Sequence, residues 1–240
     1  MKKLLESLVE KNKVYAKEGK LASYIPALME ANPEAVGICV VDLKDKYEFW
    51  AGDSDVKFTI QSISKVVSLI IALNDNGRTN VFSKVNVEPT GMGFNSIVNL
   101  EAAMENRPYN PMINAGAIVT TSLIFGETQE RKLERILNFM RRATNNPHIG
   151  INEEIYLNEK ATGDRNRALA YYMKSTGALE GDVEEVLDLY FKQCSIEATA
   201  RDLARFGAVI ANDGVTPWSN EVLMSRDICR IVKTIMVTCG

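Results

Sequence analysis

Residues 62–73 read SISKVVSLIIAL, and the polar sequence NDNG follows at 74–77. At the helical period the apolar residues of this stretch form one broad face, which is typical of a helix that packs into a protein core. Asparagine and glycine are common where a helix ends. We therefore predict a buried helix over residues 62–73, with Ser62 and Lys65 in its first turn.

The sequence before this helix predicts a β-hairpin. Residues 35–42 are rich in valine and isoleucine, residues 42–45 (DLKD) are turn-like, and residues 47–51 are aromatic before Gly52. A two-stranded hairpin is marginal in water, so it needs further strands to be stable. The sequence supplies no other convincing strand.

Helical periodicity dominates the second half of the chain. We expect helices near residues 113–125, 128–144, 152–160, 165–174, 182–193, 198–212 and 221–235. An amphipathic helix is expected within residues 1–20, a short one opened by residues 23–26 (SYIP), and irregular loops over residues 78–111. A hairpin followed by many helices predicts the α+β class and not alternating α/β.

The bulk composition is that of an ordinary globular protein. The 240 residues are 46% hydrophobic and carry a net charge of -3, so there is no bulk attraction to nucleic acid or to an anionic membrane. The first 20 residues lack the unbroken apolar core of a signal peptide, and no stretch is long enough to span a membrane. We expect a cytoplasmic protein without nucleic-acid or membrane partners.

The histidine and cysteine content limits the kinds of catalytic and metal sites that this chain can form. His148 is the only histidine, and it lies in a polar turn, which argues against a Ser-His-Asp triad or a histidine-based zinc site. The four cysteines are far apart, without metal-ligand spacing, and we interpret Cys39, Cys194, Cys229 and Cys239 as small buried hydrophobic residues. We expect neither a metal nor a cofactor.

Ser62 and Lys65 are the candidates for catalysis. Residues three apart share a helix face, so the hydroxyl and the amine can meet, and we expect them within hydrogen-bonding reach, about 2.6–3.2 Å. An apolar setting lowers the pKa of a lysine, and a neutral lysine can accept the serine proton. The alternative is a purely structural role, in which Ser62 caps the helix N-terminus and Lys65 packs its aliphatic stem on the protein while its amine stays in water. A second match to the same spacing, Ser54 and Lys57, lies in a polar turn, and we interpret it as a solvated loop.

Other segments carry polar residues in suggestive settings. Asn114 lies among small residues in NPMINAGAI (110–118), Glu159 and Asn166 flank the sequence TGD, and Tyr190 lies in an apolar stripe. Each also has a structural interpretation: a helix cap for Asn114, a capping box with surface charge for Glu159 and Asn166, and core packing for Tyr190.

Taken together, these segments resemble the serine-dependent glutaminase family, a branch of the penicillin-recognising, β-lactamase-like fold. The matching segments are residues 23–26, 61–65, 110–118, 163–166 (GDRN) and 190–197 (YFKQCSIE). The resemblance implies that Ser62 is the acylated nucleophile and Lys65 its general base. It also implies a substrate pocket lined by Tyr24, Gln61, Asn114, Glu159, Asn166 and Tyr190.

The resemblance also implies a reaction and an architecture. The substrate would be L-glutamine, hydrolysed to L-glutamate and ammonia through a γ-glutamyl ester, by a homo-oligomer (dimer or tetramer). The fold would have an antiparallel sheet flanked by helices plus a helical lobe. Residues 1–75 with 218–240 would form the sheet-containing lobe and residues 76–217 the helical lobe, with the active site in the cleft between them.

The chain departs from the family pattern at its C-terminus. Family members continue past the position of Gly240 into a tyrosine that helps to protonate the leaving group and a Lys-Ser-Gly strand whose successor supplies an oxyanion-hole N–H. Residues 174–177 (KSTG) mimic that strand motif, but they lie in a helix-to-loop turn. We therefore expect this chain to have impaired catalysis, lower stability and a tendency to self-associate, with the sheet incomplete.

Two other functions stay open at this stage. One is a β-lactamase or D-Ala peptidase, although these act outside the cytoplasm and carry a Ser-x-Asn element that we cannot locate here. The other is a binding or interaction module that keeps the glutamine pocket without turnover. Ligand binding without acylation would distinguish the second from an enzyme.

Overall fold

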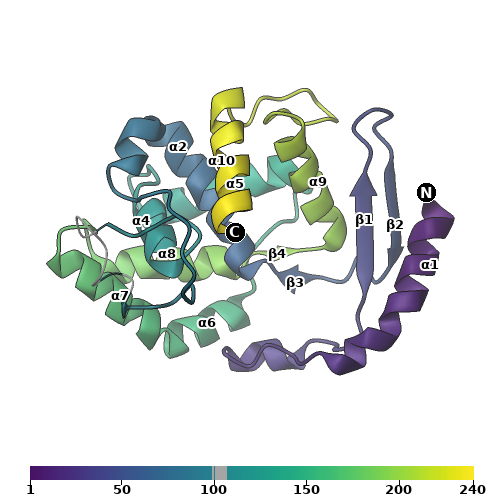
Figure 1. Cartoon of the computed structure of the whole chain (residues 1–240), viewed down its shortest axis with the longest axis horizontal. Coiled ribbons are helices and arrows are strands. Elements are labelled where there is room, and N and C mark those ends of the chain that lie inside the picture. Colours follow the sequence, from purple (N-terminus) through teal and green to yellow (C-terminus); the bar gives the residue numbers. More distant parts are fainter. Residues whose placement is uncertain (99, 101–106) are drawn as a thin grey trace.

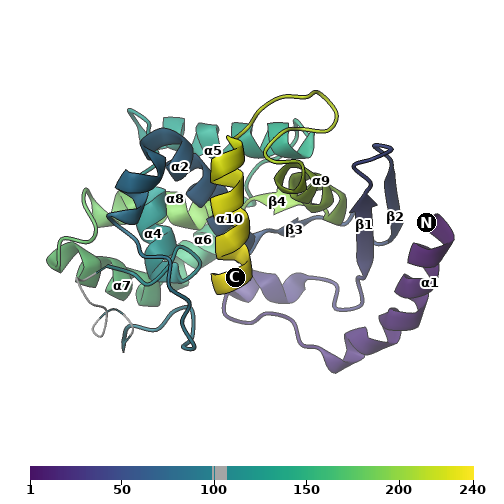
Figure 2. The same cartoon turned by 45° about the horizontal axis from the view of Figure 1, so that its top comes forward.

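The structure is a computed structural model, and it describes residues 1–98, 100 and 107–240. A β-hairpin lies at one end of the molecule, and most of the helices gather at the other end (Figure 1). Figure 2 shows the same division after a 45° turn. The α+β class predicted from the sequence is confirmed by this arrangement.

The hairpin consists of β1 (Gly37–Val41) and β2 (Glu48–Gly52). The strands are antiparallel, and the register pairs Gly37 with Gly52 and Val41 with Glu48. Helix α1 (Lys2–Lys13) packs against β2, and α9 (Ala200–Ala211) packs against β1 (Figure 1). The predicted hairpin is confirmed, and helices flank it on both sides.

A second pair of strands was not predicted. Strand β3 (Phe58–Thr59) pairs with β4 (Glu197–Ala198), and the Ile60 N–H extends this ladder by donating to the Ile196 carbonyl at 2.9 Å. Two-residue strands carry too little alternation to be recognised in a sequence. This short ladder holds the chain just before Ser62 against the chain that follows α8.

The helix predicted over residues 62–73 is present, with different ends. A 3₁₀ turn, η3 (Gln61–Ile63), precedes α2 (Ser64–Phe82), so the prediction that Ser62 begins the buried helix is wrong. Gly77 breaks α2 with φ 69°, as expected for a helix stop, but the helix resumes beyond it. Residues 78–82 are therefore helical, where loops were predicted; residues 99 and 101–106 of that predicted loop region lie outside the described part.

The remaining helices follow the predicted ranges within three residues at each end, except the last, which was predicted over residues 221–235 and is found over Arg226–Cys239. Beyond residue 110 they are α4 (Asn114–Ser122), α5 (Gln129–Thr144), α6 (Glu153–Thr162), α7 (Asp164–Ser175), α8 (Val183–Cys194), α9 and α10 (Arg226–Cys239). One short 3₁₀ helix, η1 (Val14–Glu18), follows α1, and another, η2 (Pro26–Glu30), begins at the last residue of the SYIP sequence. Within residues 1–98, 100 and 107–240, no helix has the length and apolarity that a bilayer crossing requires.

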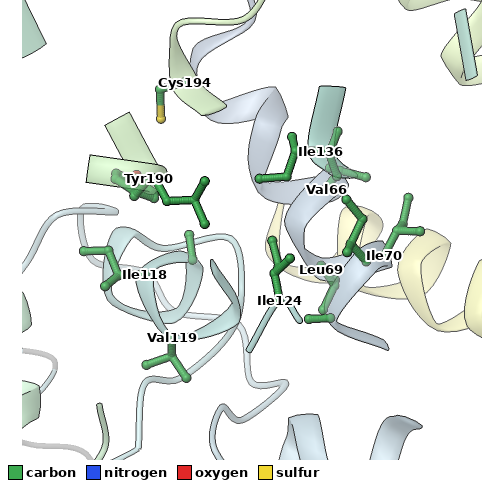
Figure 3. Packing of buried hydrophobic residues seen from close by; sticks show 14 of the residues in the cluster. Val66, Leu69, Ile70, Ile118, Val119, Ile124, Ile136, Tyr190 and Cys194 are labelled. Atoms are coloured by element: carbon green, nitrogen blue, oxygen red, sulfur yellow. The ribbon is translucent and has the colours of Figure 1, made fainter. Parts of the chain in front are cut away.

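The hydrophobic core is centred on the first half of α2. Val67, Leu69 and Ile70 are fully buried, and helices α4, α5 and α10 pack against α2 (Figure 3). Because α2 runs through this core, its N-terminal turn is held rigidly at the place where α4 and α8 converge. The division into two lobes at residues 75 and 218 stays a prediction.

Candidate active site

A cavity of about 300 Å³ opens beside the N-terminal turn of α2. Its walls come from six regions of the chain: the segment before η2, the η3 turn, the loop at residues 94–95, the start of α4, the α6–α7 junction and α8. The structure brings seven of the eight predicted site residues to this wall: Tyr24, Gln61, Ser62, Asn114, Glu159, Asn166 and Tyr190. The eighth, Lys65, is buried and does not line the cavity.

Ser62 lies at the surface of the cavity in a strained turn. Its neighbour Gln61 has φ 46°, in the left-handed region that a side chain rarely adopts, and such strain costs on the order of 1–3 kcal/mol. The Gln61 amide donates to Thr59 Oγ1 at 3.0 Å and accepts from the Tyr24 hydroxyl at 3.1 Å. These contacts hold the turn in a conformation that leaves the Ser62 side chain exposed.

Lys65 points inward, away from solvent. Its amine donates to the Met112 carbonyl at 3.0 Å and to Asn114 Oδ1 at 2.8 Å, and it lies 5.3 Å from the centre of the Phe94 ring. Burial lowers the pKa of Lys65 to about 8, although nearby Cys194 and Glu159 act in the opposite direction. The predicted apolar setting of this lysine is therefore present.

The expected direct hydrogen bond between Ser62 and Lys65 is not formed. In the described part of the chain, no hydrogen bond joins the Ser62 hydroxyl to the lysine amine. The reason is local: Ser62 belongs to the 3₁₀ turn before α2, whereas Lys65 belongs to α2 and is drawn towards the start of α4 by its two carbonyl partners.

Asn114 connects the lysine to the far side of the cavity. Its Oδ1 accepts from Lys65, and its Nδ2 donates to Asn166 Oδ1 at 2.9 Å. The side chain does not cap α4, so the structural interpretation of Asn114 as a helix cap is wrong. Since the Asn166 oxygen is occupied by this bond, the Asn166 NH₂ group is the part of that amide left to meet a ligand.

Glu159 is a buried carboxyl group with a free oxygen. It lies on α6 with 8% of its surface exposed, and Oε2 has no hydrogen-bond partner among the described residues. Burial raises the pKa of Glu159 to about 8, against smaller opposing effects of Cys194 and Lys65. A buried carboxyl group that lacks a partner and faces a cavity is suited to bind a cationic group of a ligand.

Some residues of the cavity were not predicted as site residues. Arg165 lines its mouth and donates from Nε to the Asn95 carbonyl at 3.0 Å, and Phe94 covers Lys65. Cys194 lines the cavity as well, 97% buried at the end of α8. Cys194 and Arg165 lie in the segments YFKQCSIE and GDRN, which could have pointed to them. These segments carried the family resemblance, but no role was assigned to the two residues.

The second Ser-x-x-Lys match is unlike the first. Ser54 is completely buried and its hydroxyl has no partner among the described residues, whereas Lys57 is exposed and pairs with Glu197 at 3.8 Å. The prediction of a solvated loop is therefore wrong for Ser54, which packs inside. Nothing brings its hydroxyl and the Lys57 amine together.

A serine at a cavity wall, above a buried lysine with a lowered pKa, is typical of hydrolases that use a serine nucleophile and a lysine base. A family model for glutaminases matches residues 19–240 of this chain. Glutaminase 2 of Clostridium perfringens is 62% identical over 240 residues, which is 100% of this chain and 78% of that protein. The chain belongs to the glutaminase family.

Solved structures agree with this assignment. A probable glutaminase from Bacillus subtilis is 40% identical with a TM-score of 0.90, over 100% of this chain and 73% of that one. Another Bacillus subtilis structure is the covalent complex of a glutaminase with 5-oxo-L-norleucine, formed by reaction with 6-diazo-5-oxo-L-norleucine. It has a TM-score of 0.88 at 40% identity, over 100% of this chain and 75% of that one. The resemblance read from the sequence is confirmed.

Proposed function

We propose that this site hydrolyses the side-chain amide of L-glutamine to L-glutamate and ammonia, with Ser62 as nucleophile and Lys65 as general base. The observation that carries the proposal is the state of the lysine. Lys65 is buried beside the serine turn, hydrogen-bonded to two carbonyl oxygens, and its pKa is lowered to about 8. Near neutral pH a usable fraction of the site therefore holds a free amine.

The two hydrogen bonds of Lys65 suit its neutral form. A neutral amine has two N–H groups and one lone pair, whereas an ammonium has three N–H groups. Met112 and Asn114 accept two N–H groups, and no third acceptor for Nζ occurs among the described residues. The lone pair is then left to accept the proton of Ser62, once the exposed serine side chain turns towards it.

The rest of the cavity suits an amino acid in its zwitterionic form. Glu159 lines the cavity, so its carboxyl group would accept from the α-ammonium group, and the free NH₂ group of Asn166 would donate to the α-carboxylate. Arg165 adds a positive charge at the mouth, on the side of Asn166. The hydroxyls of Tyr24 and Tyr190 would make the remaining polar contacts with the substrate.

The chemistry then follows in two steps. Ser62 Oγ attacks the amide carbon and loses its proton to Lys65, which passes the proton to the departing nitrogen, so that ammonia leaves. Water next attacks the γ-glutamyl ester, giving glutamate and restoring the serine. The residues of this cavity need neither metal nor cofactor for these steps. The covalent complex of the Bacillus subtilis glutaminase supports a nucleophile in the related site.

We also propose a homo-oligomer, dimer or tetramer, in the cytoplasm, with the cavity between two lobes. Family membership supports an assembly, and the balanced charge supports a protein without nucleic-acid or membrane partners. Light scattering of the purified protein measures the assembly directly. A monomer at micromolar concentration would refute it.

The test of the proposed function is ammonia release from L-glutamine by the wild type, Ser62→Ala and Ser54→Ala. We expect Ser62→Ala to lose a factor of about 10⁴–10⁶ in kcat, as for other serine nucleophiles, and Ser54→Ala to keep its activity if it stays folded. Glutamine binding by calorimetry without ammonia release would show a binding module instead of an enzyme. A wild type that neither binds nor cleaves glutamine would refute both.

A further inference from the structure

Asn110 opens the segment NPMINAGAI (110–118), and the proposed reaction gives it no role. Its side chain is completely buried, and it does not line the cavity. The residue lies four positions before the start of α4. A buried side-chain amide costs free energy unless it is hydrogen-bonded, so its partners show what it does in the fold.

Three hydrogen bonds hold the Asn110 side chain. Its Nδ2 donates to the Glu88 carbonyl at 2.8 Å, which ties the segment to an earlier loop. Its Oδ1 accepts from the backbone N–H of Met112 at 2.9 Å and from that of Ile113 at 3.2 Å. Asparagine side chains commonly bond to the N–H two residues on, and such an Asx turn fixes a backbone that lacks regular secondary structure.

The Ile113 N–H belongs to the same peptide group as the carbonyl that accepts from Lys65. This peptide group is trans and planar, so the N–H of Ile113 and the carbonyl of Met112 point in opposite directions. Asn110 Oδ1 holds the N–H end at 3.2 Å, and Lys65 Nζ donates to the carbonyl end at 3.0 Å. A rotation that turned the carbonyl away from the lysine would therefore also break the bond to Asn110.

Helix α4 holds the backbone of Asn110 from another side. A Cβ atom at Gly116 would lie 2.0 Å from the Asn110 carbonyl oxygen, so the helix packs directly on this part of the chain. A glycine in the second position after the start of α4 permits that close approach. The turn is therefore fixed by its own side chain and by the helix that follows it.

Asn114, the second acceptor for the lysine amine, is held independently of the Asn110 side chain. Its N–H donates to the Phe94 carbonyl at 2.8 Å, and its Nδ2 donates to Asn166 Oδ1 at 2.9 Å. A change of the Asn110 side chain should therefore act on the Met112 carbonyl more than on Asn114.

We propose that Asn110 is a positioning residue for the general base. Its side chain holds the peptide group between Met112 and Ile113, so that the Met112 carbonyl fixes one N–H of the Lys65 amine. With Asn114 fixing a second N–H, the direction of the lone pair is set by the protein. The inference rests on the proposed function for the role of Lys65, whereas the contacts concern only residues of this chain.

Other groups also act on the Lys65 amine, and the experiment leaves them unchanged. Burial lowers its pKa, whereas Cys194 from α8 and Glu159 from α6 act in the opposite direction. The Phe94 ring lies 5.3 Å from Nζ. A variant of Asn110 removes none of these groups, so its effect on the lysine reports on the Met112 carbonyl.

Asn110→Ala and Asn110→Ser form the matched pair of the experiment. Both lose the bond to the Glu88 carbonyl, and their side chains are close in size. Only serine keeps an oxygen that can accept from the N–H groups that follow it, as in an ST turn. Asn110→Cys, whose sulfur accepts weakly, takes the place of Asn110→Ala if that variant does not fold.

Asn146→Ala is the control for the loss of a turn elsewhere. Asn146 Oδ1 accepts from the His148 N–H at 2.9 Å, also two residues on, and Asn146 lies beyond the end of α5 without lining the cavity. We expect this variant to lose stability in urea while kcat for ammonia release and the pKa of Lys65 stay unchanged.

Steady-state kinetics of ammonia release from L-glutamine give the first readout. We expect kcat to fall about tenfold to a hundredfold in Asn110→Ala, the range for a displaced catalytic group, with KM changed less than threefold. Asn110→Ser should recover most of kcat. A loss of kcat that is equal in the alanine and serine variants would overturn the inference, because it would come from the shared loss of packing.

The second readout is the pKa of Lys65 in the ligand-free protein, by NMR of ¹³C-labelled lysine side chains, with Lys65→Met to assign the signal. A carbonyl that accepts from Nζ favours the ammonium form, so the pKa should fall in Asn110→Ala and return towards the wild-type value in Asn110→Ser. An unchanged pKa in Asn110→Ala would also overturn the inference. If the pKa falls but the wild type releases no ammonia, the contact stands and the proposed function fails.

Discussion

Two carboxyl groups on the facing helices α6 and α8 have opposite electrostatic environments. Glu159 lies on the cavity side of α6, where burial without a cation at hydrogen-bonding distance raises its pKa to about 8. Asp188 lies on the outer side of α8, between Lys160 and Lys192. Burial alone would raise the pKa of Asp188, but hydrogen bonds from these lysines and from Tyr156 outweigh it and lower the pKa to about 2.

The difference shows how one helix pair can serve both binding and stability. Lys160 directly follows Glu159, so the two side chains leave α6 in different directions. Lys160 and the Tyr156 hydroxyl, at 2.5 Å, contact Asp188, which also pairs with Lys192 at 2.7 Å. These contacts form a clamp, Tyr156–Lys160–Asp188–Lys192, that joins α6 to α8 from outside. The clamp gives the Asp188 carboxylate all of its hydrogen-bond partners, whereas Glu159 in the cavity wall keeps one oxygen without a partner among the described residues.

The largest effect should come from the cavity side, at the proposed general base. Lys65→Met keeps the apolar stem and removes the amine, and we expect kcat/KM to fall by about 10²–10⁴, the usual contribution of a general base. Because the pKa of Lys65 is lowered to about 8 and its neutral form is the active one, wild-type activity should rise with pH up to about 8. Loss of that rise in Lys65→Met, measured by ammonia release, is the specific signature. Unchanged activity would exclude Lys65 as the base.

The next effect concerns Glu159. Glu159→Gln keeps the shape but cannot ionise when the ammonium group binds, and glutamine binding should weaken by about 1.5–3 kcal/mol, the value of a charge-assisted hydrogen bond. The folded-state pKa of Glu159 is raised. The stability that its protonated form contributes is therefore fully present below the unfolded pKa and is lost as pH rises through about 8. The wild type should therefore lose unfolding free energy between pH 5 and pH 9, and Glu159→Gln should not lose it. The difference, variant minus wild type, should increase over this range.

Calorimetry of glutamine binding and urea unfolding at both pH values measure these effects. Tyr156→Phe is a useful companion, because it removes a hydroxyl of the clamp on the same helix and leaves the cavity unchanged. Equal affinity of the wild type and Glu159→Gln for glutamine would refute the role of Glu159 in binding the ammonium group.

The sequence predicted the long elements well and the details of the site less well. Helix α5 was predicted within one residue, because sixteen residues carry a clear helical period and end at Asn145 in the left-handed conformation. Strands β3 and β4 were missed, because two residues carry no period. Gly77 was interpreted as a terminus, although packing of the following turn continues α2 to Phe82.

The candidate site shows the same limit. Local spacing suggested that Ser62 and Lys65 touch, but the turn at Gln61 and the carbonyl partners of Lys65 decide where the two side chains point. The contact from Asn114 to Asn166 joins residues 52 positions apart. Cys194 was assigned to the core, where it is 3% exposed, but no spacing rule reveals that it also lines the cavity.

On the clamp side, Asp188→Asn should affect stability but not chemistry. Its folded-state pKa is depressed, so its contribution is present above the unfolded pKa of about 4 and is lost as pH falls through about 2. We expect a loss of about 1–2 kcal/mol in unfolding free energy at pH 7, allowing for the partial exposure of its lysine partners. The loss should shrink towards pH 2, and KM should change less than twofold.

The smallest effect is expected for Lys192, the outer member of the clamp. Lys192 and Asp188 are four residues apart on α8 and lie 2.7 Å from each other, with the lysine side chain 25% exposed. A helical pair of this kind contributes about 0.3–0.5 kcal/mol, and Lys160 and Tyr156 still hold Asp188 when Lys192 is absent. We expect Lys192→Met to lose about that much unfolding free energy in urea at low salt, and less at 1 M salt, where the remaining charges are screened. The double variant with Asp188→Asn should lose little more than Asp188→Asn alone, because the same contact is removed twice. Additive losses would show that Lys192 stabilises α8 by another route, and that the clamp is not one unit.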